Sequence, residues 1–382
     1  MYEIEGGPLT VVRFDQDDGN YMLLADEGEG TEGPKTTGNY VWFKVKNWVK
    51  WEKKLMYGPY IHHVSGIHGS FAKVLKEACK YLGPVAHDSV EPVEEMLEGN
   101  GMPYVIVKEL LAMGKKNNAC VLAFDAADVN MIKSVIKGAE TAGRPVIVML
   151  YPGMRNIMPF GVFAEVTRYY AERASVPVGL HLDHCSDFDM ILEAVHEGFP
   201  SVMADGSVLP FEENAAFTKK VVEVARNFEV DVEGELGHVG TAADSDEFSR
   251  KEFFTRPDEV REFVEKTGVT SLAVSFGSAH GLYKSTPKLD IEHLKTLSAA
   301  TDIPLVLHGG TGIPDDQLAQ AFSNGINKIN IGTEFFNLNT RLNQEFYAQD
   351  FSKADPFGFP EYIQPRLTEY ITGRLELSKI VL

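Results

Sequence analysis

The chain has little cysteine, no long apolar run and no secretion signal. Its three cysteines, among 382 residues, are Cys79, Cys120 and Cys185, too few and too far apart for a disulfide framework or a CxxC metal motif. No apolar stretch approaches the roughly 18 residues of a membrane span, and the N-terminus lacks a basic segment followed by an apolar one. These absences predict a cytoplasmic protein.

Basic residues are also scarce. Lys and Arg number 36 against 55 Asp and Glu, so the formal net charge is −19, and no Lys/Arg run forms a local basic patch. Such a chain repels nucleic acid and anionic lipid, and we expect neither as a partner. Hydrophobic residues at 44% and charged residues at 24% are typical of a globular protein.

The composition changes near residue 100. All three tryptophans fall within residues 42–51, and a Pro- and Gly-containing acidic stretch follows at 83–103. We therefore predict an α+β module over 1–90, a linker over 91–103 and a second domain over 104–382. Within the first module, residue composition and spacing predict strands at 9–14, 20–25 and 39–46 and a helix at 70–82.

In the second domain, short apolar runs alternate regularly with amphipathic stretches. The eight runs are 119–124, 145–150, 177–182, 200–204, 230–235, 271–276, 304–308 and 327–331. Short apolar runs that alternate with helices predict a parallel sheet buried on both faces, and eight such units fit a closed (β/α)8 TIM barrel. A doubly wound sheet would carry a Gly-rich turn after its first strand, where this chain has FDAADVN (124–130).

Histidines and carboxylates gather where these predicted strands end. His181, His184, His238, His280 and His308 are five of the eleven histidines, and all lie in strands or in the loops that follow them. Barrel enzymes build their sites at these ends, and imidazoles from several strands suit a catalytic divalent metal with one open position. The best ligand triplet is His184, His280 and His308. His181 lies on the opposite face of its strand from His184, but strand ends bend, so periodicity alone does not choose between them.

Two glycine-rich turns follow the last two predicted strands, HGGTG (308–312) and NIGTE (330–334). Backbone amides in such loops bind phosphate at helix N-termini, and these two loops are the usual phosphate site of a barrel. We therefore predict a phosphate-binding site beside the metal.

Residues 102–382 resemble the class II, metal-dependent fructose- and tagatose-bisphosphate aldolases. The matching strings are LHLDH (180–184), SVMADGSVLPFEEN (201–214), VEGELGHVG (232–240), SLAVSFGSAHGLY (271–283), PLVLHGGTG (304–312) and KINIGTE (328–334). The resemblance implies reversible cleavage of a phosphorylated ketose to dihydroxyacetone phosphate and an aldehyde. It also implies a dimer or tetramer.

The resemblance implies these roles. His184, His280 and His308 would hold Zn²⁺, with Glu235 as an alternative or second-site ligand for a further cation and Asp205 in the same metal region. Asp183 would exchange the proton of the C4 hydroxyl. The residues implied in phosphate and substrate binding are Gly281, Lys284, Gly309, Thr311, Asn330 and Thr333.

Three positions depart from the family pattern. A loop Glu that handles the enediol proton would fall at Ala243, and Asp244 is the first-ranked substitute, ahead of Asp246 and Glu247. Asp125 stands where the family usually has Asn, and Tyr151 stands where it often has Ser. Both would lie near substrate, and the charge of Asp125 disfavours a bisphosphate close by. The ketose and its C4 stereochemistry therefore stay open.

Residues 36–69 resemble the C-terminal domain of L-fucose isomerase-like proteins, most distinctively in GPYIHHVSG (58–66). The catalytic part of such isomerases is absent, so we interpret His62, His63 and His68 as surface or structural histidines of an accessory module. Three hypotheses follow: a zinc-dependent aldolase, a barrel that binds a sugar phosphate but turns it over weakly, and an aldose–ketose isomerase that uses the N-terminal module.

Overall fold

The computed structural model describes residues 2–4, 10–15, 20–26, 39–44, 104–237, 251–281, 283, 286–349, 355 and 357–380. By backbone contacts the chain separates into two units, Met1–Gly101 and Met102–Leu382. The helix predicted at 70–82, the linker predicted at 91–103 and the histidines His62, His63 and His68 lie outside the described residues.

The first unit contains a four-stranded antiparallel sheet in the order β1-β2-β3-β4. Its strands are β1 (Tyr2–Ile4), β2 (Thr10–Asp15), β3 (Asn20–Asp26) and β4 (Asn39–Lys44). The three strands predicted from aromatic and β-branched residues correspond to β2, β3 and β4 and are confirmed. The three-residue strand β1 was too short to be predicted.

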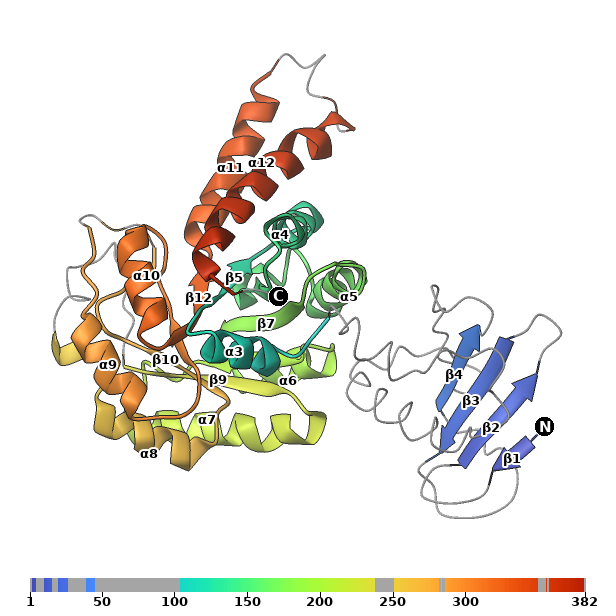
Figure 1. Ribbon diagram of the computed structural model, residues 1–382, viewed down its shortest axis with the longest axis horizontal. Coiled ribbons are helices and arrows are strands. Elements are labelled where there is room, and N and C mark those ends of the chain that lie inside the picture. Colours follow the sequence, from blue (N-terminus) through green and yellow to red (C-terminus); the bar gives the residue numbers. More distant parts are fainter. Residues whose placement is uncertain are drawn as a thin grey trace. The chain divides into compact units, whose positions relative to one another are not determined.

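The second unit is a closed barrel of eight parallel strands in the order β10-β11-β12-β5-β6-β7-β8-β9, as Figure 1 shows in part. The strands are β5 (Val121–Asp125), β6 (Val146–Leu150), β7 (Val178–Cys185), β8 (Ser201–Ala204), β9 (Asp231–Leu236), β10 (Ser271–Val274), β11 (Leu305–Leu307) and β12 (Ile326–Ile331). Each coincides with one of the eight apolar runs, and almost every strand residue is buried. The (β/α)8 prediction is confirmed, because strands covered by a packed interior and an outer helical layer must be apolar on both faces.

Helices surround the barrel, one before its first strand and the others after successive strands. They are α3 (Val107–Lys116), α4 (Val129–Ala142), α5 (Phe160–Ala171), α6 (Phe188–His196), α7 (Phe211–Ala225), α8 (Pro257–Thr267), α9 (Ile291–Ala299) and α10 (Asp315–Ser323). Side chains cap several of their first turns: Asp128 accepts a hydrogen bond from the Met131 amide, and Asp187 accepts one from Met190.

Two long helices complete the unit, α11 (Thr333–Tyr347) and α12 (Gly358–Leu375). They lie side by side and extend away from the barrel (Figure 1). The lower part of α12 packs tightly on α4, because a side chain at Gly138 would overlap Ile371 (a Cβ there would lie 2.5 Å from Ile371 Cγ2). Arg374 joins α12 to the barrel through an ion pair with Asp315 at 3.0 Å.

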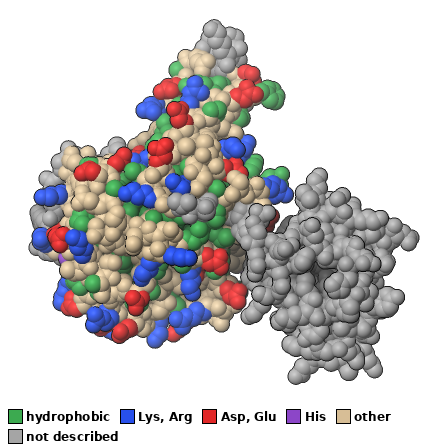
Figure 2. Space-filling view, in the orientation of Figure 1, with side chains coloured by type: hydrophobic (Ala, Val, Ile, Leu, Met, Phe, Trp, Pro, Cys, Tyr) green, Lys and Arg blue, Asp and Glu red, His purple; other side chains and the backbone are tan. Residues whose placement is uncertain are grey.

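The described helices include none with the length and apolar character needed to cross a membrane. On the face of the second unit in Figure 2, Lys and Arg side chains are interspersed with Asp and Glu.

Candidate metal centre and active site

Strand β7 ends in an irregularity that aims two neighbouring side chains at one site. Its pairing with β8 shifts register between Leu182 and Cys185, and His184 has φ +40°. Because the regular alternation breaks there, Asp183 and His184 both face the site, with Asp183 Oδ1 4.0 Å from His184 Nε2. His181, which the sequence left as an alternative, lies fully buried with Nδ1 2.7 Å from Ser201 Oγ.

His184, His280 and His308 converge from three separate strand ends. Their ring centroids lie 4.6 Å apart for His184 and His280, 4.4 Å for His184 and His308, and 5.7 Å for His280 and His308. One nitrogen from each lies within 4.8 Å of the others, a separation that allows one cation to be shared. The ligand triplet chosen from the sequence is therefore brought together.

His184 is oriented by a carboxylate. Its Nδ1 lies 2.8 Å from Asp205 Oδ2, while its buried Nε2 has no hydrogen-bond partner. A hydrogen bond from Nδ1–H to the carboxylate leaves the Nε2 lone pair free for a metal. Asp205 also accepts hydrogen bonds from the backbone and hydroxyl of Ser207, at 3.1 and 2.7 Å.

His308 lies between two glutamates of β9. Its Nδ1 is 3.1 Å from Glu235 Oε2, and its Nε2 is 3.0 Å from Glu233 Oε1. Glu235 also forms a second possible ligand group with His184 and Asp205, whose donor atoms lie within 4.8 Å of one another. The sequence-predicted position of Glu235 at the metal region agrees with this geometry.

The carboxylates favour positive charge at this cluster. Burial opposes a charge on His308, but hydrogen bonds to Glu233 and Glu235 outweigh it and raise the pKa of His308 to about 10. Burial, together with the positive charges of His184 and His308, lowers the pKa of His280 to about 3. Without a metal, a proton on His308 supplies the positive charge, so metal binding must displace that proton and weakens as pH falls.

Asp183 is held by an asparagine and faces a second carboxyl group. Asn330 donates from Nδ2 to Asp183 Oδ1 at 2.6 Å, and both side chains are buried. Asp125 is also buried, and its Oδ1 has no hydrogen-bond donor. Burial first, and then the neighbouring Asp183 carboxyl, raise the pKa of Asp125 well above its ordinary value.

The Asp125 carboxyl should destabilise the metal-free protein at high pH. Because its folded-state pKa is raised, its contribution to stability is present at low pH and is lost as pH rises through that folded value. We expect Asp125→Asn to increase the free energy of unfolding by about 1–3 kcal/mol at pH 8, and by less at pH 5. Urea unfolding of EDTA-treated protein measures both. An equal increase in the free energy of unfolding at the two pH values would contradict a raised pKa for Asp125.

The glycine loops after β10 and β11 lie against each other. Gly309 has φ +69°, and a Cβ there would lie 2.1 Å from the Ala279 carbonyl oxygen, so only glycine fits. The Tyr283 hydroxyl ties the loops together, since it accepts from the Ala279 amide and donates to the Gly309 carbonyl at 2.7 and 2.9 Å. Tyr283 was not among the site residues predicted from the sequence.

The other described residues predicted to bind phosphate belong to the loops after β10, β11 and β12 or to the strand and helix next to them. Gly281 follows His280 with φ +92°, and Thr333 is the first residue of α11. The buried Thr311 accepts a hydrogen bond from the Glu334 amide at 3.4 Å. Asn330, which the resemblance also assigns to phosphate, donates from Nδ2 to Asp183 Oδ1 in the structure.

Several predicted residues lie outside the described ranges. They are Lys284, His238, Ala243 and the acidic candidates Asp244, Asp246 and Glu247. Tyr151 is described and is 45% exposed just after β6. Its exposure agrees with a place in a loop at the carboxyl end of the barrel.

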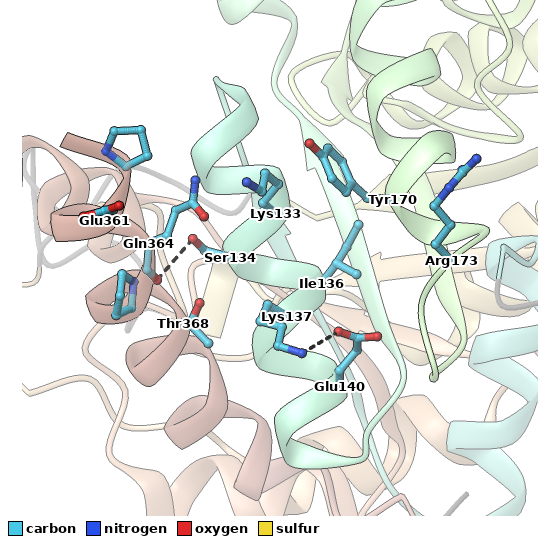
Figure 3. A pocket seen from close by; sticks show the side chains of 12 residues that line it. Lys133, Ser134, Ile136, Lys137, Glu140, Tyr170, Arg173, Glu361, Gln364 and Thr368 are labelled. Atoms are coloured by element: carbon cyan, nitrogen blue, oxygen red, sulfur yellow. Dashed lines mark hydrogen bonds and ion pairs between the residues drawn. The ribbon is translucent and has the colours of Figure 1, made fainter. Parts of the chain in front are cut away.

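A separate hollow of about 550 Å³ lies on the outside of the barrel, between α4, α5 and α12 (Figure 3). Its lining includes Ser134, which bonds the Gln364 carbonyl, and Lys137, which pairs with Glu140. None of the residues predicted for the site lines it.

A closed parallel barrel with imidazoles and carboxylates at the carboxyl ends of its strands is the architecture of a metal-dependent barrel enzyme. Residues 105–378 match the family described as fructose-bisphosphate aldolase class-II. The chain belongs to this family, whose members are metal-dependent carbon–carbon lyases that act on sugar phosphates. The enzyme class predicted from the sequence is confirmed.

Individual relatives agree with this assignment. The chain is 36% identical over 278 residues to a fructose-bisphosphate aldolase of Staphylococcus epidermidis, covering 72% of this chain and 96% of the relative. It is 36% identical over 279 residues to a fructose-bisphosphate aldolase of Staphylococcus aureus, covering 72% and 97%. The crystal structure of the YdjI aldolase from Escherichia coli K12 is similar with a TM-score of 0.65 and 31% identity, over 73% of this chain and 98% of that one.

The N-terminal unit has its own match. Residues 2–87 match the family described as L-fucose isomerase, C-terminal domain. The second resemblance drawn from the sequence is therefore also confirmed.

Proposed function

We propose that the chain is a zinc-dependent aldolase that reversibly cleaves a phosphorylated ketose to dihydroxyacetone phosphate and an aldehyde. The observation that carries this proposal is the convergence of His184, His280 and His308 beside the buried Asp183. Fructose 1,6-bisphosphate and tagatose 1,6-bisphosphate are the proposed substrate types.

The three histidines suit zinc, which prefers nitrogen ligands in a tetrahedral set with one position left for substrate. The buried, partnerless Nε2 of His184 supports this fit. Glu235 is the proposed alternative ligand, and Asp205 is proposed to orient His184. When bound, the ion would act as a Lewis acid that stabilises the negative charge left on the ketone fragment by bond cleavage.

Asp183 is the proposed acid/base residue. In cleavage it would take the proton of the C4 hydroxyl, and in condensation it would return that proton to the aldehyde oxygen. The hydrogen bond from Asn330 holds Asp183 Oδ1 in one orientation. Asn330 Oδ1 has no partner and is available to a substrate hydroxyl.

We propose that the loops after β10, β11 and β12 hold the phosphate of the dihydroxyacetone phosphate unit. The residues are Gly281, Lys284, Gly309, Thr311, Asn330 and Thr333, and α11 begins at these loops without a side-chain cap on its first turn. Asp125 is proposed to contact substrate hydroxyls near Asp183. Asp244 is the proposed proton donor to the enediol, and a homo-dimer or tetramer is the proposed assembly.

A panel of ketose phosphates tests the proposal. Purified protein with one equivalent of zinc is mixed with fructose and tagatose 1-phosphates and 1,6-bisphosphates, and dihydroxyacetone phosphate is detected with a coupled reductase and NADH. We expect cleavage of at least one of the four. Tight binding of dihydroxyacetone phosphate without any cleavage would instead favour the alternative of a barrel that only binds sugar phosphates.

A further inference from the structure

A buried ion pair lies next to His308. Lys328 Nζ in β12 is 2.9 Å from Glu233 Oε2 in β9, and both side chains are at most 1% exposed. The other oxygen of Glu233 lies 3.0 Å from His308 Nε2. Resting on the metal site of the proposed function, we propose that Glu233, held by Lys328, is a positioning residue that fixes which nitrogen of His308 binds the metal.

The two nitrogens of His308 have different surroundings. Nδ1 faces Glu235, which belongs with His184 and Asp205 to a possible ligand group. Nε2 faces Glu233, which belongs to no such group among the described residues and is already bound to Lys328. Both carboxylates can accept from His308 when no metal is bound. Because Glu233 is engaged by Lys328 whereas Glu235 belongs to a possible ligand group, a cation would displace the Nδ1 hydrogen and Nε2 would keep its own.

Lys328 limits where the Glu233 carboxylate can go. Besides the Lys328 contact, Oε2 lies 3.5 Å from Ser271 Oγ and 3.9 Å from His181 Nε2. Both Glu233 and Lys328 lie on strands of the closed barrel, so their backbones cannot shift apart without breaking strand pairing. The ammonium therefore leaves Oε1 as the oxygen available to His308.

A contribution to the stability of the fold is a weak explanation for the ion pair between Glu233 and Lys328. Burying two charges removes their hydration, and apolar residues of similar volume are often as stabilising as a buried ion pair. Removing one partner alone leaves an unpaired buried charge and can unfold a protein. Both partners must therefore be changed together to separate a role in folding from a role in orienting His308.

The test compares zinc affinities, measured by chelator competition at pH 7.5. We expect Glu233→Met/Lys328→Met to bind zinc about 10–100-fold more weakly than wild type. Glu233→Gln/Lys328→Met keeps a neutral acceptor for Nε2–H and should recover most of that loss. Asp231→Asn is the matched control, because Asp231 is a buried carboxylate of the same strand that instead accepts from the Lys108 amide. It should change zinc affinity less than threefold.

A measurement on the wild-type protein keeps the proposal testable if the double Met variant does not fold. The chain is labelled with ¹⁵N-histidine and loaded with ¹¹³Cd²⁺, and NMR identifies which ring nitrogen couples to the metal. We expect His308 to couple through Nδ1 and to keep hydrogen on Nε2.

The outcomes separate this inference from the proposed function. Coupling of His308 through Nε2, or a double Met variant that folds and binds zinc as tightly as wild type, would overturn the positioning role. Failure of the wild type itself to bind zinc or cadmium would overturn the metal site and the inference together.

Discussion

Removal of zinc with EDTA abolishes ketose cleavage, and one equivalent of zinc per chain restores it. We expect a loss of about 10³-fold or more, since a Lewis acid contributes several kcal/mol to stabilising the developing charge. The measurement is the rate of dihydroxyacetone phosphate release, followed in parallel with the metal content of the protein. Activity and zinc should fall and return together.

The alternative chemistry for an aldol cleavage is a Schiff base on lysine, which needs an uncharged, accessible amine. Lys328 is the fully buried lysine of the described barrel, and it is ion-paired with Glu233. Sodium borohydride with dihydroxyacetone phosphate should therefore leave the enzyme active. Full activity after complete metal removal, or inactivation by borohydride, would contradict the account.

Substitution of Asp183 by Asn lowers kcat by about 10²–10⁴-fold, the usual contribution of a positioned acid/base group. The amide cannot accept the hydroxyl proton, although it keeps the volume of the side chain. Zinc content should not change, since Asp183 is not among the converging ligand groups. Steady-state kinetics and metal analysis of the same preparation measure both quantities.

Asp205→Asn is the matched comparison for Asp183→Asn, because both change a carboxylate that lies next to His184. Asp205 holds His184 Nδ1, so its loss should weaken zinc binding about 10–100-fold and leave kcat of the zinc-saturated enzyme much less affected. If Asp183→Asn instead lost zinc and recovered full kcat at saturating zinc, Asp183 would not be the acid/base residue.

The sequence predicted the barrel well, because a strand buried on both faces has to be a continuous apolar run. All eight runs became strands. The meeting of His184, His280 and His308 was also predictable, since the carboxyl ends of parallel strands share one rim of a barrel. The convergence of these distant residues could therefore be predicted from the order of strands and helices alone.

Local irregularities of the backbone could not be predicted from the sequence. The choice between His181 and His184 depends on the shifted pairing at the end of β7, which strand periodicity does not encode. Asn330 reaches Asp183 across the barrel from β12, a contact that no spacing along the chain predicts.

The sequence indicates the ion pair of Glu233 and Lys328 only weakly. Glu233 and Glu235 are two residues apart and so share a strand face, and Lys328 interrupts an otherwise apolar or uncharged run. A charged residue in a predicted buried strand indicates that a partner of opposite charge lies nearby. Which residue that partner is becomes clear only once the arrangement of the strands in the barrel is known.

X-ray absorption at the zinc edge shows whether the three imidazoles share one divalent ion. For protein loaded with one equivalent of zinc, we expect nitrogen or oxygen neighbours at about 2.0–2.1 Å and the outer-shell scattering of three histidines. A sulfur neighbour at about 2.3 Å, or the absence of histidine scattering, would contradict it.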